Sequence, residues 1–389
     1  MRSLSRFIIA AAYEATCGRI SSTVMMSVRI AIMSPWNDCC GVAAHAELVG
    51  REWMSQGHEI VVFAPIQERV GGRIPIETED ERFVYRNWEM YRYGAKVEDE
   101  SSLDLYFDPS PVVNEDYDLF VIEKPCLTPL RKLLKIFDVI KRKATTIAVM
   151  HEGRVPQNVN FYKFDWDVIT LFDERYKKLL ADVMPADKTH IVPYPCHPIV
   201  EGNMLKARSK LSLPQEEGTK IVLAYGIRLN NLREVLPIFK GLRKTYNVIL
   251  LMLTGHDESI EAAKDIAREY KFTIFRKEAP PTSRLYTYLH ASNTILVHKR
   301  GADYLPTSST VHICLGSMRP ILCPDNNFVE VFNGEVMKYS NLDELRERLV
   351  DIFEERNVQS VLSDARKYVI RNSASNIAST LMRLAQSIK

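Results

Sequence analysis

Short apolar runs alternate with helical stretches in the first half of the chain. Residues 28–36 (VRIAIMSPW) predict a strand that leads into a loop, and residues 42–56 place apolar side chains at steps of three to four, as a helix does. Gly57 and His58 end this helix, and the run EIVVFAP predicts a second strand. Further strands are expected at 116–125, 145–153, 167–174 and 190–195. The order predicts a parallel sheet whose near-continuous apolar strands are covered on both faces.

The same pattern starts again after a polar stretch. Residues 198–218 are rich in Lys, Glu and Gly and contain Pro198 and Pro214, which indicates a linker. The run 220–228 (KIVLAYGIR) then predicts the first strand of a second series. Strands at 247–255, 272–277, 293–299 and 319–325 follow, with helices at 232–244, 259–270 and from Asn341 onward. The chain is therefore expected to be an α/β protein with two successive doubly wound halves.

Length and composition narrow the class of protein. The 389 residues exceed one ordinary core, and 46% hydrophobic with 26% charged residues exclude a fibre or a disordered chain. The 51 basic residues against 49 acidic ones give a net charge of +2, so no nucleic-acid partner is expected and any anion site must be local. Seven cysteines without a Cys-x-x-Cys pair indicate a reducing compartment. We therefore expect a cytoplasmic protein.

Two segments raise the question of a membrane. No run of 18 apolar residues occurs, so no spanning helix is expected. Residues 1–26 are interpreted as a disordered or non-native extension rather than a signal peptide, because the run FIIAAAY is short and is broken by Glu14 and Arg19. Residues 129–143 form a basic amphipathic stretch, which predicts either a helix that covers the sheet or a peripheral contact with the inner face of the membrane.

Candidate chemistry follows the predicted strands, because ligands of open parallel sheets bind beyond the carboxyl ends of the strands. Gly41 opens the first helix, where exposed N–H groups suit a phosphate, although a simple turn glycine is the alternative. His151 ends its strand and can donate to a hydroxyl or a phosphate, or has no role. Glu123 and Lys124 end the preceding strand, where a salt-bridged rim is the simpler interpretation. Neither a dinucleotide fingerprint nor a P-loop occurs.

The second half offers a basic and hydroxyl-rich cluster. Arg228 and Arg233 bracket the loop after its first strand, and arginine suits bidentate contacts to phosphate. Lys299 ends a later buried strand. Three hydroxyl residues directly precede the next helix: Ser308, Ser309 and Thr310. They serve as N-caps or hold a diphosphate, and the nearby basic residues favour anion binding.

Other signals are weaker. The Asp-x-Asp spellings at 116–118 and 165–167 precede their strands and so lie at the wrong edge of the sheet for a metal site. Cys39 and Cys40 belong to no set with zinc spacing, and no G-x-S-x-G elbow occurs. We expect neither a metal nor a cofactor.

The order of these parts resembles the GT-B glycosyltransferases, specifically the retaining enzymes of glycosyltransferase family 4, over nearly all of 28–389. Residues 33–65 are similar to the family's opening strand, glycine loop, helix and second strand. Residues 221–228 (IVLAYGIR) are similar to its second-domain opening, and 317–332 (SMRPILCPDNNFVEVF) to its segment GKPVIASDVGGIPEVV.

The resemblance implies two Rossmann-like doubly wound parallel-sheet domains that face a central cleft. An acceptor-side domain is expected at 27–200, a linker at 201–218 and a nucleotide-sugar domain at 219–365. A C-terminal helix at 366–389 would return to the first domain.

The resemblance also implies an activity. A UDP-, GDP- or ADP-sugar would dock on the second domain, a glycan, lipid-linked or other hydroxyl acceptor on the first, and transfer would proceed with retention and without metal. Gly41 would approach the donor phosphates. His151 matches the family's active-site histidine, and Arg228 the arginine of its G-R-x-x-x-x-K motif.

The sequence departs from the family at other positions. The lysine of that motif aligns near Asn231, so Arg233 or Lys299 would substitute for it. The family's E-x7-E pair aligns near Leu305 and Ile313, neither of which is acidic. Ser309 and Thr310 would keep the phosphate cradle. Glu330 is retained and would contact the ribose, with a rim carboxylate as the alternative.

Three functions are therefore compared. A divergent retaining glycosyltransferase is the leading hypothesis. Loss of the acidic pair favours a non-catalytic relative that binds a nucleotide or glycan. A sugar-nucleotide epimerase would need an acid–base set of carboxylates in the cleft, and the sequence offers no convincing one.

Overall fold

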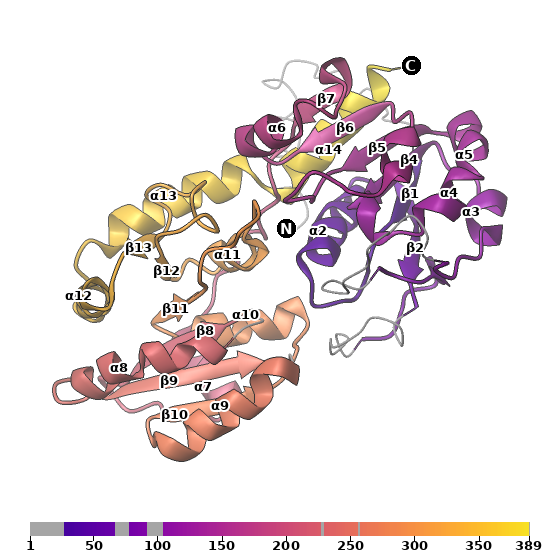
Figure 1. Cartoon of the computed structure of the whole chain (residues 1–389). Helices are drawn as coiled ribbons and strands as arrows, with labels where there is room; N and C mark the ends of the chain where they lie inside the picture. The colour runs from indigo at the N-terminus through magenta and orange to yellow at the C-terminus, as the bar shows by residue number, and fades with distance from the viewer. Residues whose placement is uncertain (1–26, 67–77, 92–103, 227–228, 256, 389) are drawn as a thin grey trace, which may run out of the picture.

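A computed structural model describes residues 27–66, 78–91, 104–226, 229–255 and 257–388 (Figure 1). The expected extension at 1–26 and the candidate Arg228 lie outside these residues. The described chain forms two α/β units, each built around a parallel sheet. The two doubly wound halves expected from the apolar pattern are thus confirmed.

The first sheet is wholly parallel in its described strands. In sheet order these are β3 (Val84–Trp88), β2 (Glu59–Pro65), β1 (Arg29–Met33), β4 (Leu119–Glu123), β5 (Thr145–Val149), β6 (Val168–Leu171) and β7 (Thr189–Ile191). The strands β4, β5 and β6 are buried along their whole length, as their continuous apolar runs predict. The edge strand β3 (VYRNW) mixes polar and apolar residues, and the apolar pattern did not predict it.

The second sheet is also parallel in its described strands. In sheet order they are β10 (Thr273–Lys277), β9 (Val248–Thr254), β8 (Lys220–Tyr225), β11 (Thr294–Leu296), β12 (Ile321–Pro324) and β13 (Met337–Tyr339). The short edge strand β13 was not expected either. In both units the order reverses beside the first strand of the unit, and this arrangement brings the loops after the central strands to one edge.

Helices cover the sheets. Those of the first unit are α2 (Gly41–Ser55), α3 (Ser110–Asn114), α4 (Leu130–Leu134), α5 (Phe137–Lys143) and α6 (Glu174–Leu180). Those that follow are α7 (Met204–Lys210), α8 (Leu236–Leu242), α9 (Asp257–Glu269), α10 (Thr282–Ala291), α11 (Ser309–Leu315), α12 (Leu342–Phe353), α13 (Val358–Arg371) and α14 (Ala374–Gln386). Short 3-10 turns lie at η3 (Pro125–Leu127), η4 (Val159–Lys163), η5 (Ala186–Lys188) and η6 (Asn230–Glu234).

The segment 201–218, expected to be a linker, is folded onto the second unit. It contains α7, which lies against α10. The buried Arg208 of α7 donates from Nε to the carbonyl of Ala291 and from Nη2 to Oδ1 of Asn293, both at 2.9 Å. These bonds satisfy a buried guanidinium, so the polar composition of the segment reflects paired side chains rather than an extended connection.

The basic stretch at 129–143 forms two short helices, α4 and α5, rather than one. Its apolar stripe is buried in the core of the first unit, at Leu130, Leu133, Phe137 and Ile140. Lys141 forms an ion pair with Asp167 at 2.5 Å, and Lys143 donates to the carbonyl of Glu115. The stripe therefore covers the sheet, which is one of the two alternatives expected from the sequence. Within the described ranges, no helix has the length and hydrophobicity that a membrane crossing requires.

The last helix ties the end of the chain to the first unit (Figure 1). The side chains of Ile377, Leu381 and Met382 on α14 belong to the core of that unit. Trp53 of α2, which is 1% exposed, donates from Nε1 to the carbonyl of Ala378 at 3.1 Å. The first unit is therefore completed by residues more than 300 positions away in the sequence.

We expect the Trp53→Ala variant to lose about 3–5 kcal/mol of unfolding free energy, because it removes a large buried ring and a hydrogen bond to α14. Urea denaturation followed by circular dichroism measures this loss. Met54→Ala is the matched control, since the neighbouring Met54 is exposed. A Trp53→Ala variant as stable as Met54→Ala would show that α14 does not complete this core.

Candidate active site

The loops after the central strands of the two sheets meet one another. A Cβ atom added to Gly41, at the start of α2, would lie 2.9 Å from Oγ of Ser309, at the start of α11. The N–H of Leu305 donates to the carbonyl of Gly153 at 2.8 Å. The carboxyl edges of both sheets therefore contribute to one junction, which is where ligands of such sheets bind.

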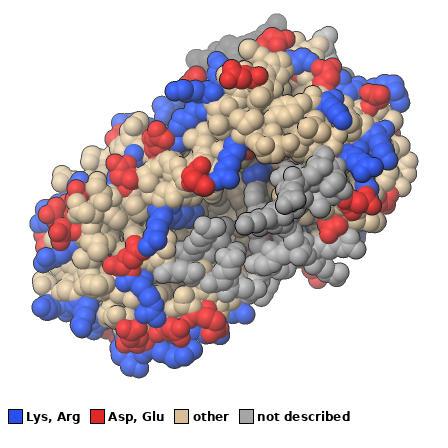
Figure 2. Space-filling view, viewed as in Figure 1, with Lys and Arg blue, Asp and Glu red and all other residues tan. Residues whose placement is uncertain are grey.

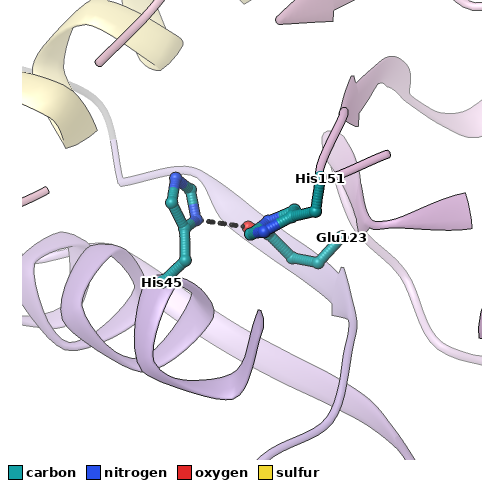
Figure 3. Close-up of side chains that lie close together, drawn as sticks. All are labelled: His45, Glu123 and His151. Carbon is teal, nitrogen blue, oxygen red and sulfur yellow. Dashed lines mark hydrogen bonds and ion pairs between the residues drawn. The ribbon is translucent and has the colours of Figure 1, made fainter. Parts of the chain in front are cut away.

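His151 lies at this junction within a buried cluster of three side chains (Figure 3). Nε2 of His151 lies 2.7 Å from Oε2 of Glu123, and Nδ1 of His45 lies 2.8 Å from Oε1 of the same carboxylate. The side chains come from α2, the end of β4 and the end of β5. Glu123 is in register with Val149, two residues before His151, so the parallel pairing of β4 and β5 places the two groups together.

Burial and pairing act in opposite directions on these groups. Burial by itself raises the pKa of Glu123, but the charge of His45 and the hydrogen bonds from both imidazoles lower it to about 2. Burial lowers the pKa of His151 to about 4, although the hydrogen bond to Glu123 raises it. Near pH 7 the carboxylate is therefore ionised and the His151 ring is neutral.

A second charged pair follows directly on the same two strands. Lys124, whose φ of 51° is left-handed, follows Glu123, and the buried Glu152 follows His151. Burial lowers the pKa of Lys124 and raises that of Glu152, and each charge opposes the shift of the other. Oε1 of Glu152 accepts from the N–H of Cys126 at 3.2 Å. The strand ends that the sequence suggested as a rim are thus part of the buried junction.

Tyr194 joins the histidine cluster to the glycine loop. Its hydroxyl donates to the carbonyl of Gly41 at 2.5 Å, and its ring lies 5.3 Å from His45 and 4.9 Å from His312 of α11. Burial raises the pKa of Tyr194 well above its usual value, so the phenol keeps its proton and remains a donor. Tyr194 therefore contacts the start of α2 and both sides of the junction.

Several donor-site candidates are brought together here. Gly41 faces Ser309, and Nζ of Lys299 donates to Oγ1 of Thr310 at 3.1 Å. The Lys299 ammonium also lies 5.5 Å from the centre of the Phe328 ring. The helix α11 has only seven residues, so its dipole is a minor source of attraction for an anion. The main attraction would come from the side chains of Lys299, Ser309 and Thr310.

Other candidates lie differently. Ser308 is buried and makes no side-chain cap, and its carbonyl accepts from Nδ1 of His312 at 2.9 Å. Arg233 on η6 forms an ion pair with Glu269 at 3.0 Å, with both side chains half-exposed. Glu330 is 60% exposed and lies 3.0 Å from Nη1 of Arg175 on α6. Arg233 and Glu330 are thus held by ion pairs of their own.

The stretch around Leu305 docks the two units together. Leu305 aligns near the first acidic residue of the E-x7-E pair in the family that the sequence resembles. Leu305 packs on the core of the first unit, and its carbonyl accepts from the hydroxyl of Tyr176 at 3.3 Å. The same hydroxyl lies 2.9 Å from Oγ1 of Thr307, and Arg154 pairs with Asp303 at 2.5 Å. Leu305 therefore serves as a structural contact between the units.

Two residues of the junction, His45 and Tyr194, carried no role in the sequence interpretation, and Glu123 was interpreted only as part of a salt-bridged rim. His45 lies one helical turn after Gly41 on the side of α2 that is buried, and a polar residue there signals a buried partner. Glu123 and His151 end neighbouring strands, which is a second signal. Tyr194 follows the edge strand β7, and no local pattern distinguishes it.

The cluster also has the chemistry of a metal site. The donor atoms of His45, Glu123 and His151 all lie within 4.8 Å of one another, and two imidazoles with a carboxylate suit a divalent ion. The direct imidazole–carboxylate hydrogen bonds, however, satisfy Glu123 without an ion. The expected absence of a metal stays a prediction.

No protein-family model matches this sequence. Solved structures do resemble the fold. A sucrose-phosphate synthase from Thermosynechococcus elongatus shares 13% identity over 93% of this chain and 99% of its own, with a TM-score of 0.60. A glycosyltransferase from Rickettsia africae shares 13% over the same fractions, with a TM-score of 0.62.

HepE from Anabaena, solved in complex with UDP, shares 11% identity over 92% of this chain and 100% of its own, again with a TM-score of 0.62. It was also solved with UDP and glucose. At these identities the similarity establishes the architecture. The chain has the GT-B fold of glycosyltransferases, as expected from the resemblance.

We expect Gly153→Val to separate the two units, because a Cβ at Gly153 would lie 2.2 Å from the carbonyl oxygen of Leu305. Small-angle X-ray scattering should show a larger radius of gyration than in the unsubstituted protein.

Gly241→Val is the control, since a Cβ at Gly241 meets nothing within 4 Å. An unchanged radius of gyration in a folded Gly153→Val variant would contradict the docking role of this contact.

Proposed function

We propose that this protein is a glycosyltransferase that moves a sugar from a nucleotide-sugar donor to a hydroxyl acceptor, with retention and without a metal ion. The donor is a UDP-, GDP- or ADP-sugar held mainly by the second unit, and the acceptor is a glycan, a lipid-linked sugar or another hydroxyl held by the first. One observation carries the proposal: Gly41, His151 and the pair Lys299–Thr310 converge where the loops after the strands of the two sheets meet, with Tyr194 beside both His151 and Gly41.

The donor side of the proposal rests on the groups that suit a diphosphate. Lys299 supplies a cation, Ser309 and Thr310 supply hydroxyl donors, and the bare backbone of Gly41 permits close approach from the first unit. Arg228, which lies outside the described residues, is expected from the sequence to add a second cation. Together these groups would stabilise the charge that develops on the leaving diphosphate.

The acceptor side rests on His151. The neutral ring of His151 follows β5 and is held by a hydrogen bond to Glu123. In this position it can bond a sugar hydroxyl or an acceptor hydroxyl. Glu123 itself is engaged by two imidazoles and is poorly placed as a nucleophile. This supports direct attack by the acceptor on the face that the diphosphate leaves, which retains the configuration.

A non-catalytic GT-B protein that binds a nucleotide or glycan is the second candidate. The specific observation in its favour is Leu305, which packs on the first unit where the family has a carboxylate. The contact between Gly41 and Ser309 adds to this, because a diphosphate between them requires the junction to open. Both candidates bind a nucleotide or a glycan, but only the glycosyltransferase also transfers a sugar.

Calorimetric titration with UDP, GDP and ADP, with and without EDTA, tests the proposal. We expect one nucleotide to bind with micromolar affinity and EDTA to leave the affinity unchanged. Arg228→Ala and Lys299→Ala should each weaken binding about ten- to a hundredfold, since each loses a charge-assisted contact of about 1.5–3 kcal/mol.

Lys264→Ala is the matched control, because Lys264 is exposed and pairs with Glu261 on the surface of α9. Figure 2 shows acidic and basic side chains mixed over the described part of the face that is in view. A loss of nucleotide binding in Arg228→Ala and Lys299→Ala but not in Lys264→Ala would therefore indicate a local binding site rather than a general effect of charge. Failure of all three nucleotides to bind would refute the donor site.

A further inference from the structure

A carboxylate between two imidazoles determines where the protons of both rings lie. Glu123 is 2% exposed, and its two oxygens face Nδ1 of His45 at 2.8 Å and Nε2 of His151 at 2.7 Å (Figure 3). The pKa of Glu123, lowered to about 2, keeps the group ionised near pH 7. An ionised carboxylate can only accept hydrogen bonds, so both facing nitrogens carry a hydrogen.

The tautomer of His151 follows from this constraint. Its ring is neutral near pH 7, because burial lowers its pKa to about 4, and a neutral imidazole carries one N–H. That hydrogen is on Nε2, toward Glu123, and Nδ1 is left with a lone pair. Nδ1 then accepts hydrogen bonds, which suits a hydroxyl and does not suit a phosphate oxygen, since that oxygen also only accepts.

We propose that His45 is a positioning residue that holds His151, through Glu123, in the tautomer with an unprotonated Nδ1, and so makes His151 an acceptor for a substrate hydroxyl. This rests on the proposed transferase function for the identity of the hydroxyl. The tautomer itself exists without any substrate and can be measured alone.

After burial and Glu123, His45 is the next group that affects the protonation of His151. His45 on α2 and Lys124 after β4 act against protonation of His151, whereas Glu123 favours it. Tyr194 lies 6.3 Å away, and the apolar ring of Phe172 packs edge-on at 4.7 Å and restrains the imidazole. Loss of His45 removes one of two donors to a buried carboxylate, so Glu123 and His151 should both take up protons at a higher pH.

Nitrogen NMR of protein labelled with ¹⁵N-histidine tests the proposal. The signals of His151 are assigned by their disappearance in His151→Gln. In the unsubstituted protein we expect an unprotonated Nδ1 and a protonated Nε2 from about pH 8 down to about pH 5. In His45→Leu we expect the midpoint of the His151 titration to rise, and the two tautomers to mix over the pH range in which Glu123 takes up a proton.

His45→Asn is the matched variant. The amide nitrogen of Asn lies near the position of Nδ1 in histidine and can donate to Glu123, so this variant should keep most of the original tautomer and midpoint. Circular dichroism establishes that each variant is folded. If His45→Leu does not fold, the tautomer of the unsubstituted protein and the His45→Asn spectra decide the question.

Three results would overturn the proposal. One is a protonated Nδ1 on His151 in the unsubstituted protein. Another is a folded His45→Leu variant whose His151 titration is unchanged. The third is stoichiometric binding of Zn²⁺, titrated alone, that is lost in His45→Leu, because the three residues would then be a metal centre. Nucleotide binding is measured separately, so its absence refutes the transferase without touching the tautomer.

Discussion

The buried charge of Glu123 is the constraint around which the first unit's half of the site is arranged. An unpaired carboxylate in a protein interior costs several kcal/mol, so the chain must supply partners for it. One partner comes from α2 and the other from the end of β5. Satisfying the charge fixes α2 against the sheet, and the first residue of α2 is Gly41, which faces the second unit. A single buried interaction thus links the core to the junction.

The second unit meets this arrangement through contacts that depend on small residues. Gly41 admits Ser309, and Gly153 admits the backbone of Leu305. Tyr194, through its ring contact with His312, and Tyr176, through its hydrogen bond with Thr307, bridge the same junction from the first unit. Where the family resemblance implies a carboxylate that binds the donor, this chain has a leucine that docks the units together. Under the proposed function, the chemistry expected of that position would come from other side chains, of which Lys299 and Thr310 are the best placed.

Much of the fold could be predicted from apolar runs, because buried parallel strands need side chains that are apolar on both faces. The edge strands β3 and β13 could not, since only part of each strand is buried and its pattern is mixed. The stretch 129–143 was expected to be one helix, and its division into α4 and α5 has no clear signal in the periodicity. Composition alone predicted a linker at 201–218, and Arg208 shows why this was misleading. In the sequence Arg208 is one more charged residue of the kind found in linkers, but in the structure it is buried and donates to a backbone carbonyl.

The candidate site was partly predictable for a related reason. Gly41, His151, Lys299 and Thr310 each follow a central strand, and the carboxyl ends of parallel strands share one edge. The roles of His45 and Tyr194 depend on pairings between distant segments, which local patterns do not contain. Arg233 and Glu330 are held by Glu269 and Arg175, and no single strand end reveals those partners.

A crystal structure with whichever of UDP, GDP or ADP binds would show directly whether the junction holds the donor. We expect a diphosphate between the start of α2 and Lys299, within hydrogen-bonding distance of the Lys299 ammonium and with Ser309 moved away from Gly41. A nucleotide bound elsewhere, with the contact between Gly41 and Ser309 intact, would contradict this expectation.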